Sequence, residues 1–200
     1  MHPYATDSDE RPKVLLGIAF VSLLASWGLH SLFLALNFTP HWLLDVPSFA
    51  GFYYIFLEWF DKNLWRMPFF QKVGLVKVPY IAGNWVGYIN SSYDEHKSQI
   101  KAAIQIKQTW TEIRITLETD NSISRSETAS IITKIPDMAL ISYEYINEPK
   151  SQAISSMQIH RGTARHEYQT IESYEIFNGG YYTGRGRVTF GSLYFKRESK

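Results

Sequence analysis

Aromatic and arginine side chains are interleaved through the second half of the sequence. Aromatic faces stack on nucleobases, and an arginine guanidinium pairs with a phosphate through two parallel hydrogen bonds. The same residue types also fill the cores and cover the outer faces of β-barrels, so their presence leaves both interpretations open. The aromatic set is Trp85, Trp110, Tyr143, Tyr145, Tyr181 and Tyr182. The arginine set is Arg114, Arg125, Arg161, Arg165, Arg185 and Arg187.

The segment YYTGRGRVTFG, residues 181–191, makes the question specific. In a strand, alternate residues share a face. Arg185 and Arg187 therefore share one face with Tyr181, and Tyr182 shares the opposite face with Phe190. If the first face is inside, the arginines line a cavity and need an anion or acidic partners. If the second face is inside, the arginines point to water.

Other chemistries find little support in the sequence. It has no GxSxG, P-loop or HExxH motif, so we expect no enzyme. His160 and His166 in HRGTARH share a strand face, but without further ligands they are interpreted as structural, and no metal or cofactor is expected. The absence of cysteine excludes disulfides. A net charge of +1 argues against DNA or RNA as a partner.

Two apolar stretches near the N-terminus predict a transmembrane helical hairpin. Val14 to Phe38 carries no formal charge and exceeds the about 20 residues needed to cross a bilayer. The second stretch, Val46 to Phe60, is short for a span and also fits an interfacial helix, although flanking tryptophans favour crossing. We therefore expect a two-pass membrane protein.

Lysine and arginine place both ends of this hairpin on the cytosolic side. Arg11 and Lys13 precede the first stretch, and Lys62, Arg66 and Lys72 follow the second, whereas the loop between has neither residue type. The domains expected are an N-terminal cytosolic tail (1–13), a two-helix transmembrane region (14–65), a linker (66–80) and a cytosolic β-barrel (81–200).

The polar second half shows short alternating segments separated by turns, which predict about eight antiparallel strands in a lipocalin-like barrel. A barrel of this size holds one small ligand. Apolar residues change face near Thr109–Glu112, which indicates a bulge or a turn between two strands. NGG, residues 178–180, is interpreted as the turn before a closing hairpin.

The layout resembles the two-transmembrane, β-strand-rich effectors of bacterial cyclic-oligonucleotide-based antiphage signalling (CBASS). The resemblance rests on WFDKNLWR, GNWVGYI, IQIKQTWTEIRITLETDNSISRS, HRGTARHEY and GGYYTGRGRVTFGSLYFKR, and covers essentially the whole chain. It implies an antiphage defence effector whose barrel binds a cyclic di- or oligonucleotide made by a linked nucleotidyltransferase. The resemblance also implies that the chain lies in the bacterial inner membrane, where ligand promotes homo-oligomerisation and the helices then disrupt the lipid bilayer. The positions it implies for ligand binding are Trp85, Trp110, Tyr182, Thr183, Arg185 and Arg187.

Two other functions fit the same layout. A membrane-tethered, lipocalin-like carrier of an apolar ligand would have an apolar cavity with its arginines outside. A structural membrane subunit would have a solid barrel and no ligand.

Overall fold

The computed structural model describes residues 1–39, 41–172, 174–184 and 187–198, and for residues 42–46 it describes the backbone alone. The chain forms two compact units. One is helical and comprises Ser8–Lys77; the other is a barrel that comprises Met1–Asp7 and Val78–Lys200. Each unit is described by itself below.

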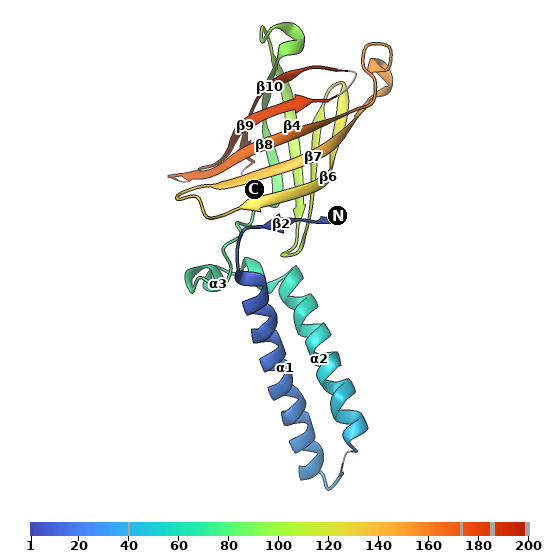
Figure 1. Ribbon diagram of the computed structural model, residues 1–200, viewed down its shortest axis with the longest axis vertical. Helices are drawn as coiled ribbons and strands as arrows, with labels where there is room; N and C mark the ends of the chain where they lie inside the picture. Colours follow the sequence, from blue (N-terminus) through green and yellow to red (C-terminus); the bar gives the residue numbers. More distant parts are fainter. Residues whose placement is uncertain (40, 173, 185–186, 199–200) are drawn as a thin grey trace. The chain divides into compact units, whose positions relative to one another are not determined.

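The helical unit is built on two helices that lie side by side, α1 (Glu10–Ala35) and α2 (Trp42–Lys62), shown in blue and cyan in Figure 1. Every fourth residue of α1 is buried, and the stripe consists of Glu10, Val14, Ile18, Ser22 and Ser26. Such a stripe follows one ridge of the helix. The small side chains in its second half allow close approach between helices.

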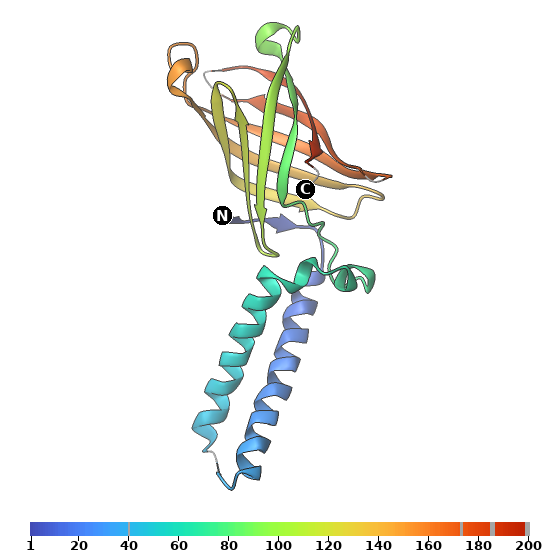
Figure 2. The ribbon, with the colours of Figure 1, turned by 180° about the vertical axis from the view of Figure 1, so that it is seen from behind.

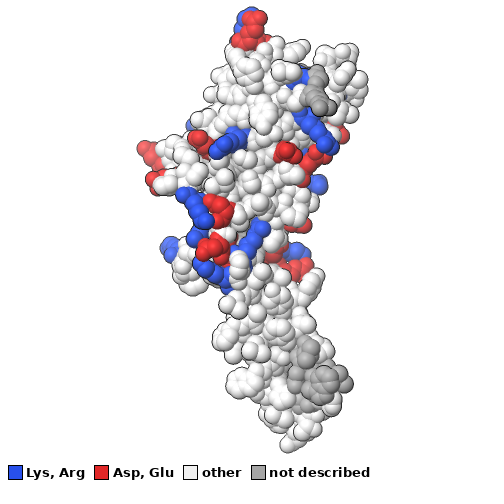
Figure 3. All heavy atoms as spheres, viewed as in Figure 1, with Lys and Arg blue, Asp and Glu red and all other residues white. Residues whose placement is uncertain are grey.

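The remaining surface of α1 is apolar and exposed. Leu16 is 73% exposed, Phe20 61% and Trp27 68%. A helix that is apolar all round and exposed in its own unit suits a lipid environment. Among the described residues, α1 is the one helix long and apolar enough to cross a membrane. Figure 3 shows no charged side chain on the visible described surface at the end of the hairpin where α1 and α2 are connected.

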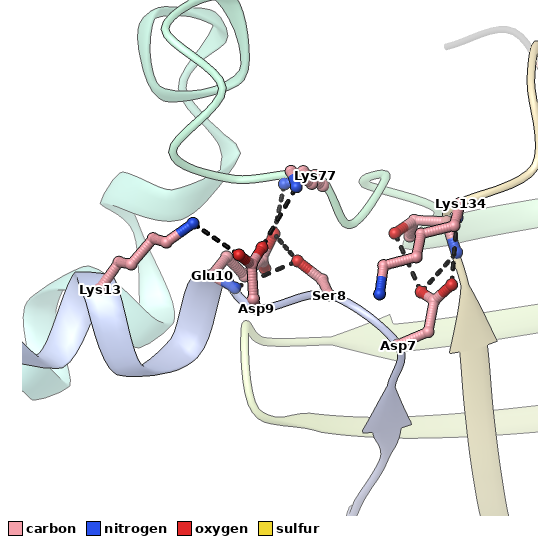
Figure 4. Close-up of polar contacts among 8 residues, drawn as sticks. Asp7, Ser8, Asp9, Glu10, Lys13, Lys77 and Lys134 are labelled. Atoms are coloured by element: carbon pink, nitrogen blue, oxygen red, sulfur yellow. Dashed lines mark hydrogen bonds and ion pairs between the residues drawn. The ribbon is translucent and has the colours of Figure 1, made fainter.

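Polar contacts fix the start of α1 within the helical unit (Figure 4). Asp9 pairs with Lys13 at 2.6 Å and with Lys77 at 3.2 Å, and the Glu10 carboxylate accepts a hydrogen bond from the backbone N–H of Lys77. These two lysine partners hold the pKa of Asp9 at about 2. The far end of α2 continues into a short 3-10 helix, η1 (Leu64–Arg66), and helix α3 (Pro68–Lys72).

The second unit is a closed barrel of eight antiparallel strands (Figure 1 and Figure 2), which confirms the predicted fold class. Each strand pairs with the next along the chain, and β10 returns to pair with β3. The apolar residues change face near Thr109 because a turn separates β4 from β5, which is one of the two alternatives that the sequence predicted. The strands are β3 (Gly83–Ser91), β4 (Gln99–Gln108), β5 (Glu112–Thr119), β6 (Ser122–Ile132), β7 (Ala139–Pro149), β8 (His160–Ile171), β9 (Tyr174–Thr183) and β10 (Phe190–Arg197).

Glycines at inward-facing positions allow neighbouring strands to approach closely where the barrel curves. A Cβ atom on Gly87 would lie 1.9 Å from the carbonyl oxygen of Tyr194, and one on Gly179 would lie 1.9 Å from that of Arg165. Glycine in a strand often marks such an approach. The prediction that NGG forms a turn is therefore wrong, because residues 178–180 lie inside β9, where Gly179 serves the curvature.

The first seven residues belong to the barrel, whereas the sequence predicted a cytosolic tail. Two short strands, β1 (His2–Pro3) and β2 (Ala5–Thr6), pair with β5 and β6 respectively. They occupy the place where β5 and β6 diverge after three paired residues. Tyr4 is buried between them, and its hydroxyl donates to the carbonyl oxygen of Trp110 at 2.7 Å.

Asp7 ends this N-terminal arm, residues 1–7, with a set of hydrogen bonds (Figure 4). Its carboxylate accepts from the backbone N–H of Thr133 at 2.8 Å and from that of Lys134 at 3.1 Å. Slight burial raises the pKa of Asp7, but these hydrogen bonds outweigh it, so the pKa lies below its usual range. The arm is thus fixed to the barrel at both of its ends.

Candidate functional site

A cavity opens inside the barrel at the end that carries the β3–β4, β5–β6, β7–β8 and β9–β10 connections. About 190 Å³ of it is accessible to the centres of water molecules. Residues from all eight barrel strands and from all four of these connections form its wall. They are Ile89, Ser91, Tyr93, Ile100, Leu117, Thr119, Asn121, Ser122, Ser124, Tyr143, Tyr145, Asn147, Ser156, Met157, His160, Ala164, Tyr181, Thr183, Arg187, Thr189 and Leu193.

The two sides of the cavity differ in chemistry. Hydroxyl and amide groups from β5, β6 and β7 line one side, among them Thr119, Ser124 and Asn147. Aliphatic side chains from β3, β4 and β10 line the other, among them Ile89 and Leu193. A wall with a few placed polar groups among apolar and aromatic ones is typical of a small-molecule site.

Arg187 is the cation of this cavity among the described residues. It is partly exposed, and its guanidinium lies 5.0 Å from the centre of the Tyr93 ring. No carboxylate of the described residues forms an ion pair with it. A guanidinium without an acidic partner, held over an aromatic ring, is available to an anionic ligand.

The positive charge of Arg187 affects the pKa values of two neighbouring side chains, His160 and Tyr145. Burial lowers the pKa of His160, the hydrogen bond with the Gln158 carbonyl oxygen opposes this, and the positive charge of Arg187 lowers the pKa further. Burial raises the pKa of Tyr145, and Arg187 opposes that increase. A bound phosphate would reverse the influence of Arg187 on both groups, because a nearby negative charge favours protonation.

Beneath the cavity, His166 supports Tyr143. The two rings are stacked with centroids 5.6 Å apart, and Nε2 of His166 lies 3.2 Å from the Tyr143 hydroxyl oxygen. Burial lowers the pKa of His166 to about 4, so the imidazole is uncharged at pH 7. The described residues contain no group of three or more His, Cys, Asp and Glu side chains arranged to hold a metal ion.

The structure brings two of the six predicted site residues into the cavity wall, Thr183 and Arg187. Thr183 is buried, and its N–H and hydroxyl both donate to the carbonyl oxygen of Thr189. Tyr182 lies on the outer face and is 61% exposed. Arg185 lies outside the described residues.

The two predicted tryptophans are fully buried and do not line the cavity. The Trp85 ring lies 4.0 Å from that of Phe177, its indole N–H donates to the Ile81 carbonyl oxygen, and the Arg197 guanidinium covers its face at 4.7 Å. Trp110 lies in the β4–β5 connection. Both side chains therefore contribute to the packed interior of the barrel unit and not to the lining of the cavity.

The six predicted residues did not include most of the wall. The sequence places Tyr143, Tyr145 and Tyr181 only in the wider aromatic set, favours a structural role for His160 and does not single out Asn147. The alternation of MALISYEYIN contained a usable signal, since Tyr143, Tyr145 and Asn147 share a face with apolar Ile141. All four side chains are buried.

Fold and cavity together define a class: a closed antiparallel barrel with a small-molecule cavity, carried on an apolar helical hairpin. The family model described as "Cap15, cyclic dinucleotide receptor domain" matches residues 76–197. The chain therefore belongs to this Cap15 family, which confirms the resemblance to CBASS effectors. It is 32% identical over 160 residues to CD-NTase-associated protein 15 of Yersinia aleksiciae, covering 79% of this chain and 73% of that protein. It is 29% identical over 138 residues to the protein of the same name from Staphylococcus schleiferi, covering 69% and 70%.

Proposed function

We propose that the barrel cavity binds a cyclic di- or oligonucleotide, and that binding converts the chain into an oligomer whose helices disrupt the membrane. The observation that carries this proposal is Arg187, a cation that pairs with no carboxylate of the described residues and lies at the edge of a cavity lined by four tyrosines. Guanidinium and aromatic groups supply the phosphate pairing and base stacking that such a ligand needs. The family description points to the same ligand class.

An apolar-ligand carrier is less compatible with this cavity. That function predicted an apolar wall with the arginines outside, but Arg187, His160 and Asn147 line the interior. A buried amide or guanidinium is unfavourable beside an apolar ligand, because it loses hydrogen bonds to water without replacement.

Direct binding by the full chain tests the proposal. We expect the protein, purified in detergent, to bind at least one member of a panel of cyclic di- and trinucleotides with micromolar or better affinity by titration calorimetry. We also expect that ligand to release a dye from liposomes that contain the protein. A linear dinucleotide of the same bases serves as the control. Binding of no cyclic nucleotide would refute the receptor function, and binding without dye release would refute the membrane step.

Ligand can drive assembly only if it binds the assembled state more tightly than the resting state. We expect cyclic nucleotide and protein concentration to act together, so that dye release rises more steeply than in proportion to protein density in the liposome. The exposed apolar surface of α1, which includes Leu16, Phe20 and Trp27, gives the helices an area for contact with lipid or with other helices.

We further propose that both helices cross the membrane. The chain has no cysteine, so single cysteines report on topology without background. We expect Thr39→Cys, in the α1–α2 connection, to react with a membrane-impermeant maleimide in intact spheroplasts. Glu95→Cys, at the exposed β3–β4 connection, should react only after lysis. Labelling of Glu95→Cys in intact spheroplasts together with protection of Thr39→Cys would reverse the orientation. Labelling of both cysteines in intact spheroplasts, or of both only after lysis, would place the two sites on the same side of the membrane and leave α1 as the sole crossing.

A further inference from the structure

Asn147 holds its side-chain amide in one orientation. Its Oδ1 accepts a hydrogen bond from the Ser124 hydroxyl at 2.8 Å, and its Nδ2 donates to Sδ of Met157 at 3.3 Å. A thioether sulfur accepts weakly and cannot donate, so rotating the amide by 180° would direct oxygen against sulfur. Asn147 is 4% exposed and Ser124 8% exposed. The NH2 group is therefore fixed at the cavity wall.

The partner of this NH2 group is a poor one. Within the described residues, the contact with Met157 is the one hydrogen bond that Nδ2 makes. Met157 lies in the β7–β8 connection and itself lines the cavity. A ligand oxygen would be a stronger acceptor than the thioether, and a buried amide donor favours the ligand that satisfies it.

The side of the cavity that carries Asn147 has no formal charge. The residues that β5, β6 and β7 contribute to the wall are neutral, whereas the described cation is Arg187 in the β9–β10 connection. Phosphates are therefore best placed near Arg187, and the neutral side is suited to an uncharged part of the ligand. In a cyclic nucleotide those parts are the riboses and the bases.

We infer that Asn147 reads a base edge and selects a base that presents a carbonyl oxygen, as guanine and uracil do, over adenine, which presents an amino group at the corresponding position. This inference rests on the proposed binding of a cyclic nucleotide in the cavity. At C6, where guanine carries an oxygen, adenine carries an amino group. That group would meet the Asn147 NH2 group donor to donor, and both would lose their hydrogen bonds. Such a mismatch lowers affinity about tenfold.

The experiment compares the dissociation constants of three cyclic dinucleotides: two adenines, two guanines and two uracils. Wild type should bind the adenine-only ligand about tenfold more weakly than the tighter of the other two. Asn147→Asp presents an acceptor in place of the donor and should reverse this ratio. Ser124→Ala frees the amide to rotate and should bring the ratio toward one. Asn84→Asp, an exposed asparagine on the outer face of β3, controls for added negative charge.

The ratio between ligands, not the absolute affinity, decides the matter. If Asn147→Asp weakens all three ligands equally, the amide contacts a phosphate or ribose and base reading is refuted. If neither Asn147→Asp nor Ser124→Ala changes any of the three dissociation constants, Asn147 does not contact the ligand and base reading is likewise refuted. In either case Arg187→Ala tests the proposed function separately, because it should weaken all three ligands if they bind in the cavity. If wild type binds none of the panel described above, the proposed function itself fails.

Discussion

Replacing Gly179 with alanine should prevent the barrel from closing properly between β8 and β9. The new Cβ would lie 1.9 Å from the carbonyl oxygen of Arg165 and 2.9 Å from Cα of His166. Both are backbone atoms, so no side chain can rotate away, and the two strands must separate. We expect a loss of at least about 3 kcal/mol in the free energy of unfolding. That loss corresponds to a fall of about 10 °C in melting temperature for a unit of this size.

Gly184→Ala provides a matched control for this substitution. A Cβ at that position would meet its nearest atom at 3.7 Å, an ordinary van der Waals distance. The melting temperatures of wild type, Gly179→Ala and Gly184→Ala are measured by circular dichroism on the full chain in detergent. Equal melting temperatures for all three proteins would show that β8 and β9 tolerate separation, and would contradict the role assigned to Gly179.

Removal of the Arg187 side chain should have the largest effect on ligand binding. Arg187→Ala loses a charge-assisted contact in a partly desolvated cavity, which corresponds to at least about 2 kcal/mol, or roughly a 30-fold lower affinity. Arg187→Lys should recover only part of this, because an ammonium group cannot pair with a phosphate through two parallel hydrogen bonds. Titration calorimetry measures the affinity for the ligand. Loss of membrane potential in cells that make the ligand measures the disruption of the membrane.

Arg161→Ala is the matched control for Arg187. Its side chain is 75% exposed, lies near the same end of the barrel, and is 3.6 Å from the carboxylate of Glu127. An exposed pair of this kind contributes little. We expect Arg161→Ala to bind like wild type. An equal loss of affinity in both variants would mean that general positive charge, and not the position of Arg187, attracts the ligand.

The alternation of polar and apolar residues made the barrel predictable. It also correctly assigned the residues of the segment 181–191 to two opposite faces. Tyr181, Thr183 and Arg187 do lie together, on the inside, while Tyr182 and Phe190 are exposed. Alternation did not reveal which group faces inward, because both groups contain aromatic residues. Which group faces the barrel interior depends on how this segment pairs with β8 and β10. That pairing cannot be read from the sequence of the segment itself.

Residue type alone could not separate a stacking tryptophan from a core tryptophan. Trp85 and Trp110 have the same large aromatic surface in either role, and the structure buries both away from the cavity. The hydrogen bond between Ser124 and Asn147 could not be predicted from the sequence for another reason. Its members are 23 residues apart and meet only through the pairing of β6 with β7.

The N-terminal arm makes the helical hairpin an insertion within the barrel unit, since residues of that unit stand on both sides of it in the sequence. A fragment that begins at Val78 therefore lacks more than the helical unit. It also lacks β1, β2, the buried Tyr4 and the hydrogen bonds of Asp7. A soluble version of the receptor should instead keep Met1–Asp7 and connect it through a short linker to Val78, because the hairpin occupies the position of a loop in the chain.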